Sequence, residues 1–287
     1  MTGDSQSATK STIVLRVDDI RGRFDEFINT TSSLHVDEGY VITATTGVVD
    51  VVGQSPAGLF YGVQTLLSLV TADETGRRRL VVGEVVDAPR FSYRGLMLDV
   101  SRNFIPKDII MRTIDAMAAY KMNRLHLHLT DDQGWRLDVP DLPELTAVGA
   151  RRGHDSSTNG HRSMLPAYLG SGPSPDDAAS NGGGGGGFYS REDYRDILRH
   201  ARRHHVTVIP EVDVPGHSAA AIVSMRAQRR RNFTLVDEND IMDQASVNSF
   251  VMDLCLTSTL SFVEHIINTL VELHRVCQSS PNTVPYL

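Results

Sequence analysis

The sequence predicts an α/β fold in which parallel strands alternate with helices, preceded by a small α+β domain with an open sheet. From about residue 91, short buried strands alternate with amphipathic helices, and this order implies parallel strands joined by helical crossovers. Before residue 90, strand-like segments surround one helix. The stretch Asp87-Ala88-Pro89-Arg90 separates the two patterns, because Pro89 lacks a backbone donor and restricts its neighbour. We therefore expect domains at residues 1–90 and 91–287.

The first domain is expected to contain a small sheet and one helix. Its strand segments are rich in β-branched residues, and Leu59, Val63 and Leu66 recur at helical spacing. The predicted strands are Thr12–Val17, Tyr40–Ala44, Val48–Val52 and Leu80–Val86, and the predicted helix is Pro56–Val70.

The second domain is expected to repeat the strand-and-helix unit. Ile110 and Ile114 share one face of a helix that begins near Pro106. Between the second and third strands, Gly170–Gly187 includes six consecutive glycines, which predict a mobile surface loop. The predicted strands are Leu96–Val100, Arg124–Leu129 and Val206–Pro210, the helices are Pro106–Tyr120, Arg191–His204 and Leu260–Cys277, and Asn282–Leu287 is a candidate fourth strand.

Composition and charge narrow the classes of partner. A formal charge of −7 leaves no basic surplus for phosphates, so we expect no nucleic-acid partner. No apolar run approaches the roughly 18 residues that a membrane span needs. Met1–Thr12 is polar and lacks the hydrophobic region of a secretory signal. Cys255 and Cys277 are too few for a disulfide-built scaffold, and the sequence leaves open whether they pair.

Ionisable side chains follow each predicted strand of the second domain. In α/β barrels and in doubly wound sheets, the carboxyl ends of the strands carry the chemistry. His126 and His128 share one face of their strand, and Glu211 and Asp213 share one face of theirs, so these faces are expected to point into a barrel. The residues at the strand ends are Asp99 and Arg102, then Asp131, Asp132 and Trp135, and finally Glu211, Asp213 and His217.

These residues allow several interpretations. They could form a polar layer that only stabilises a barrel, although their recurrence at three strand ends favours a functional site. Trp135 could pack in the core or present its ring to a pyranose. His126 and His128 also resemble a zinc site, because imidazoles two residues apart on a strand can reach one ion. Such a motif normally opens a barrel at its first strand, whereas here a strand precedes it, so we expect no metal or other cofactor.

Three long motifs occur in order along the second domain, at Tyr93–Phe104, Lys121–Arg136 and Val208–His217. Together they resemble glycoside hydrolase family 20, the β-N-acetylhexosaminidases. The segments Leu165-Pro166, Leu169–Pro173 and Leu254-Cys255-Leu256 resemble the bacterial chitobiase branch of that family, and Ser55–Leu69 looks like the helix of its small preceding domain. The resemblance implies the first three to four strands of a (β/α)8 TIM barrel.

The resemblance also implies a substrate and roles for four residues. The family removes terminal N-acetylglucosamine or N-acetylgalactosamine by substrate-assisted retaining hydrolysis, in which the sugar's own 2-acetamido group attacks the anomeric carbon. Arg102 matches the arginine that binds sugar hydroxyls, and its guanidinium fork suits paired acceptors. Asp131 matches an acid that supports the pocket. Asp213 and His217 match the pair that tunes the proton affinity of the catalytic glutamate.

The sequence departs from the family where the catalytic Asp-Glu pair is expected. No Gly-Gly-Asp-Glu motif follows His217, and Pro281–Leu287 stands where the family approaches that motif. We therefore expect a truncated chain that contains no catalytic residue, is inactive as it stands and would meet the pair just after Leu287. The alternatives are a non-catalytic fragment or sugar-binding remnant and a metal-dependent hydrolase. Family members are usually secreted, periplasmic or lysosomal, and the sequence leaves the compartment open.

Overall fold

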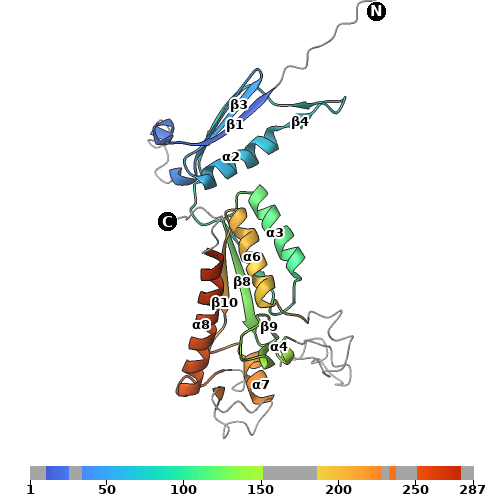
Figure 1. The fold of residues 1–287 in the computed structure, drawn as a ribbon, viewed down its shortest axis with the longest axis vertical. Helices are drawn as coiled ribbons and strands as arrows, with labels where there is room; N and C mark the ends of the chain where they lie inside the picture. Colours follow the sequence, from blue (N-terminus) through green and yellow to red (C-terminus); the bar gives the residue numbers. More distant parts are fainter. Residues whose placement is uncertain (1–10, 26–33, 151–185, 228–232, 237–250, 279–287) are drawn as a thin grey trace, which may run out of the picture. The chain divides into compact units, whose positions relative to one another are not determined.

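The computed structural model describes residues 11–25, 34–150, 186–227, 233–236 and 251–278 (Figure 1). The chain divides into two compact units, Met1–Arg94 with Asp115–Asn123, and Gly95–Ile114 with Arg124–Leu287. The candidate strand Asn282–Leu287 and most of the predicted loop Gly170–Gly187 lie outside the described residues. Within the described residues, no helix has the length and apolar character needed to cross a membrane.

The first unit has a mixed sheet in the order β1-β3-β2-β6, with one helix packed on it. β2 pairs antiparallel with β3 and β6, while β1 pairs parallel with β3. The helix begins where the Ser55 side chain accepts a hydrogen bond from the backbone N–H of Gly58. The elements are β1 (Thr12–Val17), β2 (Tyr40–Thr45), β3 (Val48–Gly53), β6 (Gly83–Asp87) and α2 (Pro56–Leu69).

These bounds confirm the four predicted strands and the helix, with one difference. The segment predicted as Leu80–Val86 begins as a strand only at Gly83. Before it, β4 (Thr71–Ala72) and β5 (Arg78–Arg79) form a short antiparallel ribbon that sequence periodicity did not predict. Two-residue strands are too short to show a periodic pattern.

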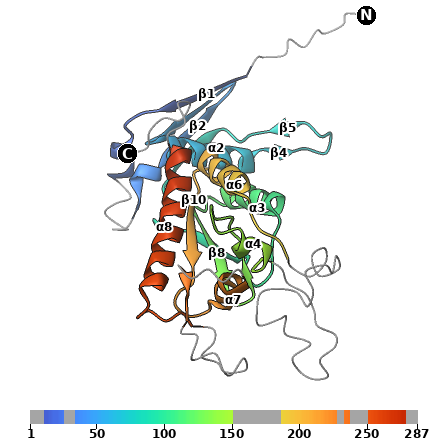
Figure 2. The same cartoon turned by 60° about the horizontal axis from the view of Figure 1, so that its bottom comes forward.

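The second unit contains a parallel sheet in the order β10-β8-β7, with the short β9 antiparallel to the end of β8. Helices connect these strands, as the predicted order requires, and Figure 2 shows α8 running alongside β10. The elements are β7 (Gly95–Asp99), α3 (Lys107–Ala119, of which the residues from Asp115 on are grouped with the first unit), β8 (Arg124–Asp131), β9 (Gly134–Trp135), α4 (Glu144–Ala147), α6 (Arg191–Arg203), β10 (Thr207–Val212), α7 (Ala219–Ala227) and α8 (Thr257–Gln278).

The predicted strands and helices of this unit are confirmed, and three elements were not predicted. β8 and β10 each extend two residues past their expected ends. Asp131 therefore belongs to β8 and Glu211 to β10, whereas we expected both residues just after their strands. α4 and β9 are too short to show periodicity. α7 opens on three alanines, which carry helix propensity but no amphipathic pattern.

Candidate functional site

The carboxyl ends of β7, β8 and β10 bring three ionisable residues into one row. The strand register places Asp99 opposite His128, and His128 opposite Glu211. Nε2 of His126 lies 2.6 Å from Oε2 of Glu211, and Nδ1 of His128 lies 2.8 Å from the same oxygen. The His128 contact has the distance of an ion pair without the angle of a good hydrogen bond. Ionic contacts between side chains therefore connect β8 and β10, in addition to the backbone hydrogen bonds of the sheet.

His128 and Asp131 form the buried centre of this row. Nε2 of His128 lies 2.9 Å from Oδ2 of Asp131, and both side chains are almost fully buried. The hydrogen bond to Asp131 raises the pKa of His128 to about 9 despite burial, which lowers it, and Glu211 adds to the rise. Burial raises the pKa of Asp131, but the hydrogen bonds from His128 and from the backbone of Asp132 outweigh it, so this pKa lies below its usual range. At neutral pH the pair is therefore an imidazolium beside a carboxylate.

Arg102 is fixed by two carboxylates at the same edge. Its Nη1 lies 2.7 Å from Oδ2 of Asp99, and its Nη2 lies 2.6 Å from Oδ2 of Asp131. The backbone N–H of Arg102 also donates to Oδ1 of Asp99 at 2.9 Å. The Arg102 side chain nevertheless stays 44% exposed, so the guanidinium is oriented on one side and open to solvent on the other. This arrangement can present N–H donors to a polar ligand.

Asp213 and His217 lie in the segment that follows β10. The backbone N–H of Asp213 donates to Oγ1 of Thr130 at 3.0 Å. Nδ1 of His217 lies 3.4 Å from Oδ1 of Asp131 and 3.4 Å from Oδ2 of Asp132. One ligand atom from each of Asp131, Asp213 and His217 lies within 4.8 Å of the other two. The structure thus brings these residues together with Arg102, and their roles stay predictions.

Asp132 and Arg136 have positions that the sequence did not reveal. Oδ1 of Asp132 accepts the backbone N–H of Ala219 at 3.0 Å, at the first residue of α7, and burial raises the pKa of this carboxyl. Arg136 is fully buried, and its guanidinium donates to backbone carbonyls. These partners are distant in sequence, so no local pattern could have identified them.

Trp135 is a core residue, and the interpretation of its ring as a sugar platform is wrong. Its side chain is 1% exposed, and its ring centroid lies 5.9 Å from that of Phe262. Its indole Nε1–H donates to the carbonyl oxygen of Leu137 at 2.7 Å. A ring covered in this way has no face left for a pyranose.

The ionisable residues at this edge, here called the charged row, fit a metal ion poorly; they are Asp99, His128, Asp131, Glu211, Asp213 and His217. His128, Glu211 and Asp213 have suitable donor types within 4.8 Å, as do Asp131, Asp213 and His217. However, a doubly protonated His128 offers no lone pair to a metal. Asp131 is already paired with Arg102 and His128, and a further cation would be repelled by both. The donor set therefore favours a hydrogen-bonded network over the zinc site.

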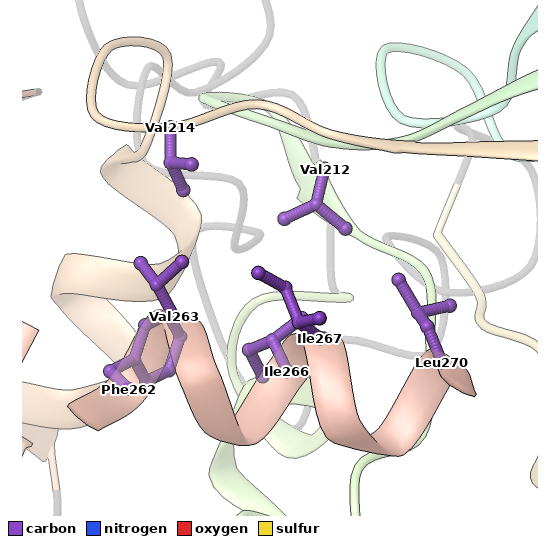
Figure 3. Close-up of a pocket in the computed structure, with 7 residues that line it drawn as sticks. All are labelled: Val212, Val214, Phe262, Val263, Ile266, Ile267 and Leu270. Atoms are coloured by element: carbon purple, nitrogen blue, oxygen red, sulfur yellow. The ribbon is translucent and has the colours of Figure 1, made fainter. Parts of the chain in front are cut away.

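An apolar cavity of about 100 Å³ lies between β10 and α8 (Figure 3). Its walls are aliphatic and aromatic and offer a sugar no hydrogen-bonding side chain. It is lined by Val212, Val214, Phe262, Val263, Ile266, Ile267 and Leu270. The cavity is therefore distinct from the charged row.

Two protein-family models match the chain. One is described as glycosyl hydrolase family 20, catalytic domain, and matches residues 91–281. The other is described as glycosyl hydrolase family 20, domain 2, and matches residues 4–88.

Curated relatives and solved structures agree with this match. The N,N'-diacetylchitobiase of Vibrio harveyi is 42% identical over 76% of this chain and 25% of the relative, and a β-hexosaminidase of Vibrio vulnificus is 40% identical over 82% and 28%. A family 20 exo-β-N-acetylglucosaminidase from Vibrio harveyi, solved with N-acetylglucosamine, gives a TM-score of 0.69 at 27% identity and covers 92% of this chain and 42% of that chain. The chain thus spans 25% and 28% of the length of these two curated relatives.

Proposed function

Because the chain belongs to glycosyl hydrolase family 20, we propose that its second unit forms an amino-sugar-binding site of a β-N-acetylhexosaminidase. The substrate class is a terminal N-acetylglucosamine or N-acetylgalactosamine on a chito-oligosaccharide or glycan. The observation that carries the proposal is Arg102, which Asp99 and Asp131 orient at the carboxyl edge of the sheet while part of its guanidinium stays open. Sugar hydroxyls are suitable acceptors for that fork.

The residues around Arg102 have different proposed roles. Glu211 contacts His128, which fixes Asp131, and Asp131 in turn fixes the guanidinium proposed to bind the sugar hydroxyls. Asp213 and His217 supply charge and a hydrogen-bonding group at the same edge of the sheet, where they would set the proton affinity of a general acid. In the proposed reaction the acetamido oxygen attacks the anomeric carbon as the glycosidic C–O bond breaks, and the leaving oxygen takes a proton from that acid.

The sequence contains no Gly-Gly-Asp-Glu motif, in which the family places this acid. We therefore propose that these 287 residues bind the amino sugar without hydrolysing a glycoside by themselves. Turnover of a chromogenic N-acetyl-β-glucosaminide by the 287-residue chain, abolished by Asp213→Ala, would contradict this part of the proposal.

Binding is the direct test. We expect calorimetric titration of the full chain to detect N-acetylglucosamine and to show weaker binding of glucose, which lacks the 2-acetamido group. Arg102→Lys should lower the affinity by about tenfold, because a charge-assisted hydrogen bond contributes about 1.5–3 kcal/mol. Arg112→Lys, at an exposed position on α3, is the matched control and should change nothing. Equal affinity for both sugars, or an unchanged Arg102→Lys variant, would refute the proposed site.

A further inference from the structure

One histidine in helix α6 and one at its C-terminal cap lie one turn apart. His200 and His204 are four residues apart, so their side chains lie on the same side of the helix. Their ring centroids are 4.4 Å apart, with 36° between the ring planes. One nitrogen of each ring lies within 4.8 Å of the other. Zinc–nitrogen bonds of about 2.1 Å place two ligands of a tetrahedral ion about 3.4 Å apart, a separation that small side-chain rotations can reach.

The tautomer of His204 is the one that metal sites commonly use. Its Nδ1 lies 2.8 Å from the backbone carbonyl oxygen of His200. A carbonyl oxygen only accepts, so Nδ1 donates, and in the neutral ring the lone pair is then on Nε2. Metal-binding histidines typically donate their other ring nitrogen to a carbonyl or carboxylate, which fixes the ring orientation.

The pair also lies on a scaffold that is already ordered. Tyr194, Ile197 and Ala201 of α6 are buried, so packing of the helix sets the spacing of the two histidines before any ligand binds. His204 is the C-terminal cap of the helix, where the partial negative charge of the backbone carbonyls favours a cation. Both observations lower the free energy required to assemble a site here.

We propose that His200 and His204 bind a divalent transition-metal ion, with water completing its coordination. Cu²⁺, Ni²⁺ and Zn²⁺ bind imidazole nitrogen well, whereas Mg²⁺ and Ca²⁺ prefer oxygen ligands. Chelation across one turn holds the C-terminal end of α6 in its helical conformation, so the ion stabilises the fold.

This site is separate from the candidate sugar site. α6 ends at the start of β10, whereas Glu211 lies near the other end of that six-residue strand. A strand of that length spans about 20 Å. In barrels, the end of the sheet where strands begin contributes to stability, whereas the chemistry occurs at the other end. The metal is therefore expected to leave N-acetylglucosamine affinity unchanged.

The test is metal binding by the full chain prepared without a histidine tag. Titration calorimetry with Ni²⁺ and with Zn²⁺ should show a site whose affinity falls at least tenfold in His200→Gln and in His204→Gln. His205→Asn is the matched control: it removes an adjacent imidazole, and asparagine tolerates the left-handed φ of 55° found there. We expect this control to retain the parent affinity, and Mg²⁺ or Ca²⁺ not to compete.

A spectroscopic readout keeps the proposal testable if a variant fails to fold. Electron paramagnetic resonance of the unmodified chain with one equivalent of Cu²⁺ should show nitrogen couplings from two imidazoles. Coupling to fewer than two imidazoles would overturn the proposal. So would folded His200→Gln and His204→Gln variants that bind as tightly as the parent, or a His205→Asn variant that loses as much affinity as they do.

Discussion

The buried imidazolium of His128 should make the stability of the second unit depend on pH. The hydrogen bond to Asp131 raises the pKa of His128 in the folded protein to about 9, against an ordinary value of 6.5. A folded-state pKa above the unfolded value gives stability that is fully present below pH 6.5 and is lost as the pH rises through about 9. At about 1.4 kcal/mol per pKa unit, the loss amounts to about 3 kcal/mol.

Urea unfolding across this pH range measures the effect. We expect the free energy of unfolding of the full chain to fall by about 3 kcal/mol between pH 6 and about pH 10. His128→Gln should be less stable at neutral pH and should flatten this dependence. His126→Gln is the control, because His126 contacts the same Glu211 oxygen from a partly exposed position without contributing the bond to Asp131.

An NMR titration of His128 tests the ion pair with Asp131 without a measurement of the free energy of unfolding. The ring-proton resonances of His128, followed by NMR, should titrate well above neutral pH. A His128 that titrates below pH 7, or a parent protein whose unfolding free energy is constant over this range, would refute the ion-pair argument. The carboxyls of Asp131 and Glu211 act in a separate acid window, because their pKa values are lowered and their contribution is lost only as the pH falls through those values.

Three further predictions concern the core and the site. Arg136→Lys should lower the free energy of unfolding by about 3 kcal/mol, because several buried carbonyl oxygens lose the donors of the guanidinium fork. Urea unfolding measures this change, and a loss below about 1 kcal/mol would contradict the prediction. Trp135→Phe should destabilise by about 1–3 kcal/mol without changing N-acetylglucosamine affinity in calorimetry, and a large loss of affinity would restore the ring to the binding site. Chelator treatment should leave the same affinity unchanged, and a loss that Zn²⁺ reverses would favour a metal at the charged row.

Much of the fold could be predicted from local patterns, and β8 is an example because apolar and polar residues alternate along it. Leu125, Leu127 and Leu129 alternate with His126 and His128, and the three leucines are fully buried. A period of two residues is a local property, so one sequence suffices to detect it. Clustering of ionisable residues at the strand ends likewise follows from the parallel order of the strands.

The contacts that define the site could not be predicted in the same way. Arg102 meets Asp131 across two strands, and that pairing depends on the strand register, which only the folded sheet sets. Arg136 shows the same limit in the core. An arginine is normally expected at the surface. Arg136 directly follows β9, which pairs with β8, and it is fully buried with backbone carbonyl oxygens as its partners.

Arg136 also joins two described residues that are distant in sequence, Ala150 and Gly187. Its Nη1 donates to the carbonyl oxygens of Ala150 and Gly187, and the backbone N–H of Gly187 donates to the carbonyl oxygen of Ala150. Both ends of the intervening chain are thus joined at one guanidinium. One buried side chain therefore holds two chain positions that are distant in sequence, and its loss would release Ala150 and Gly187 from the core together.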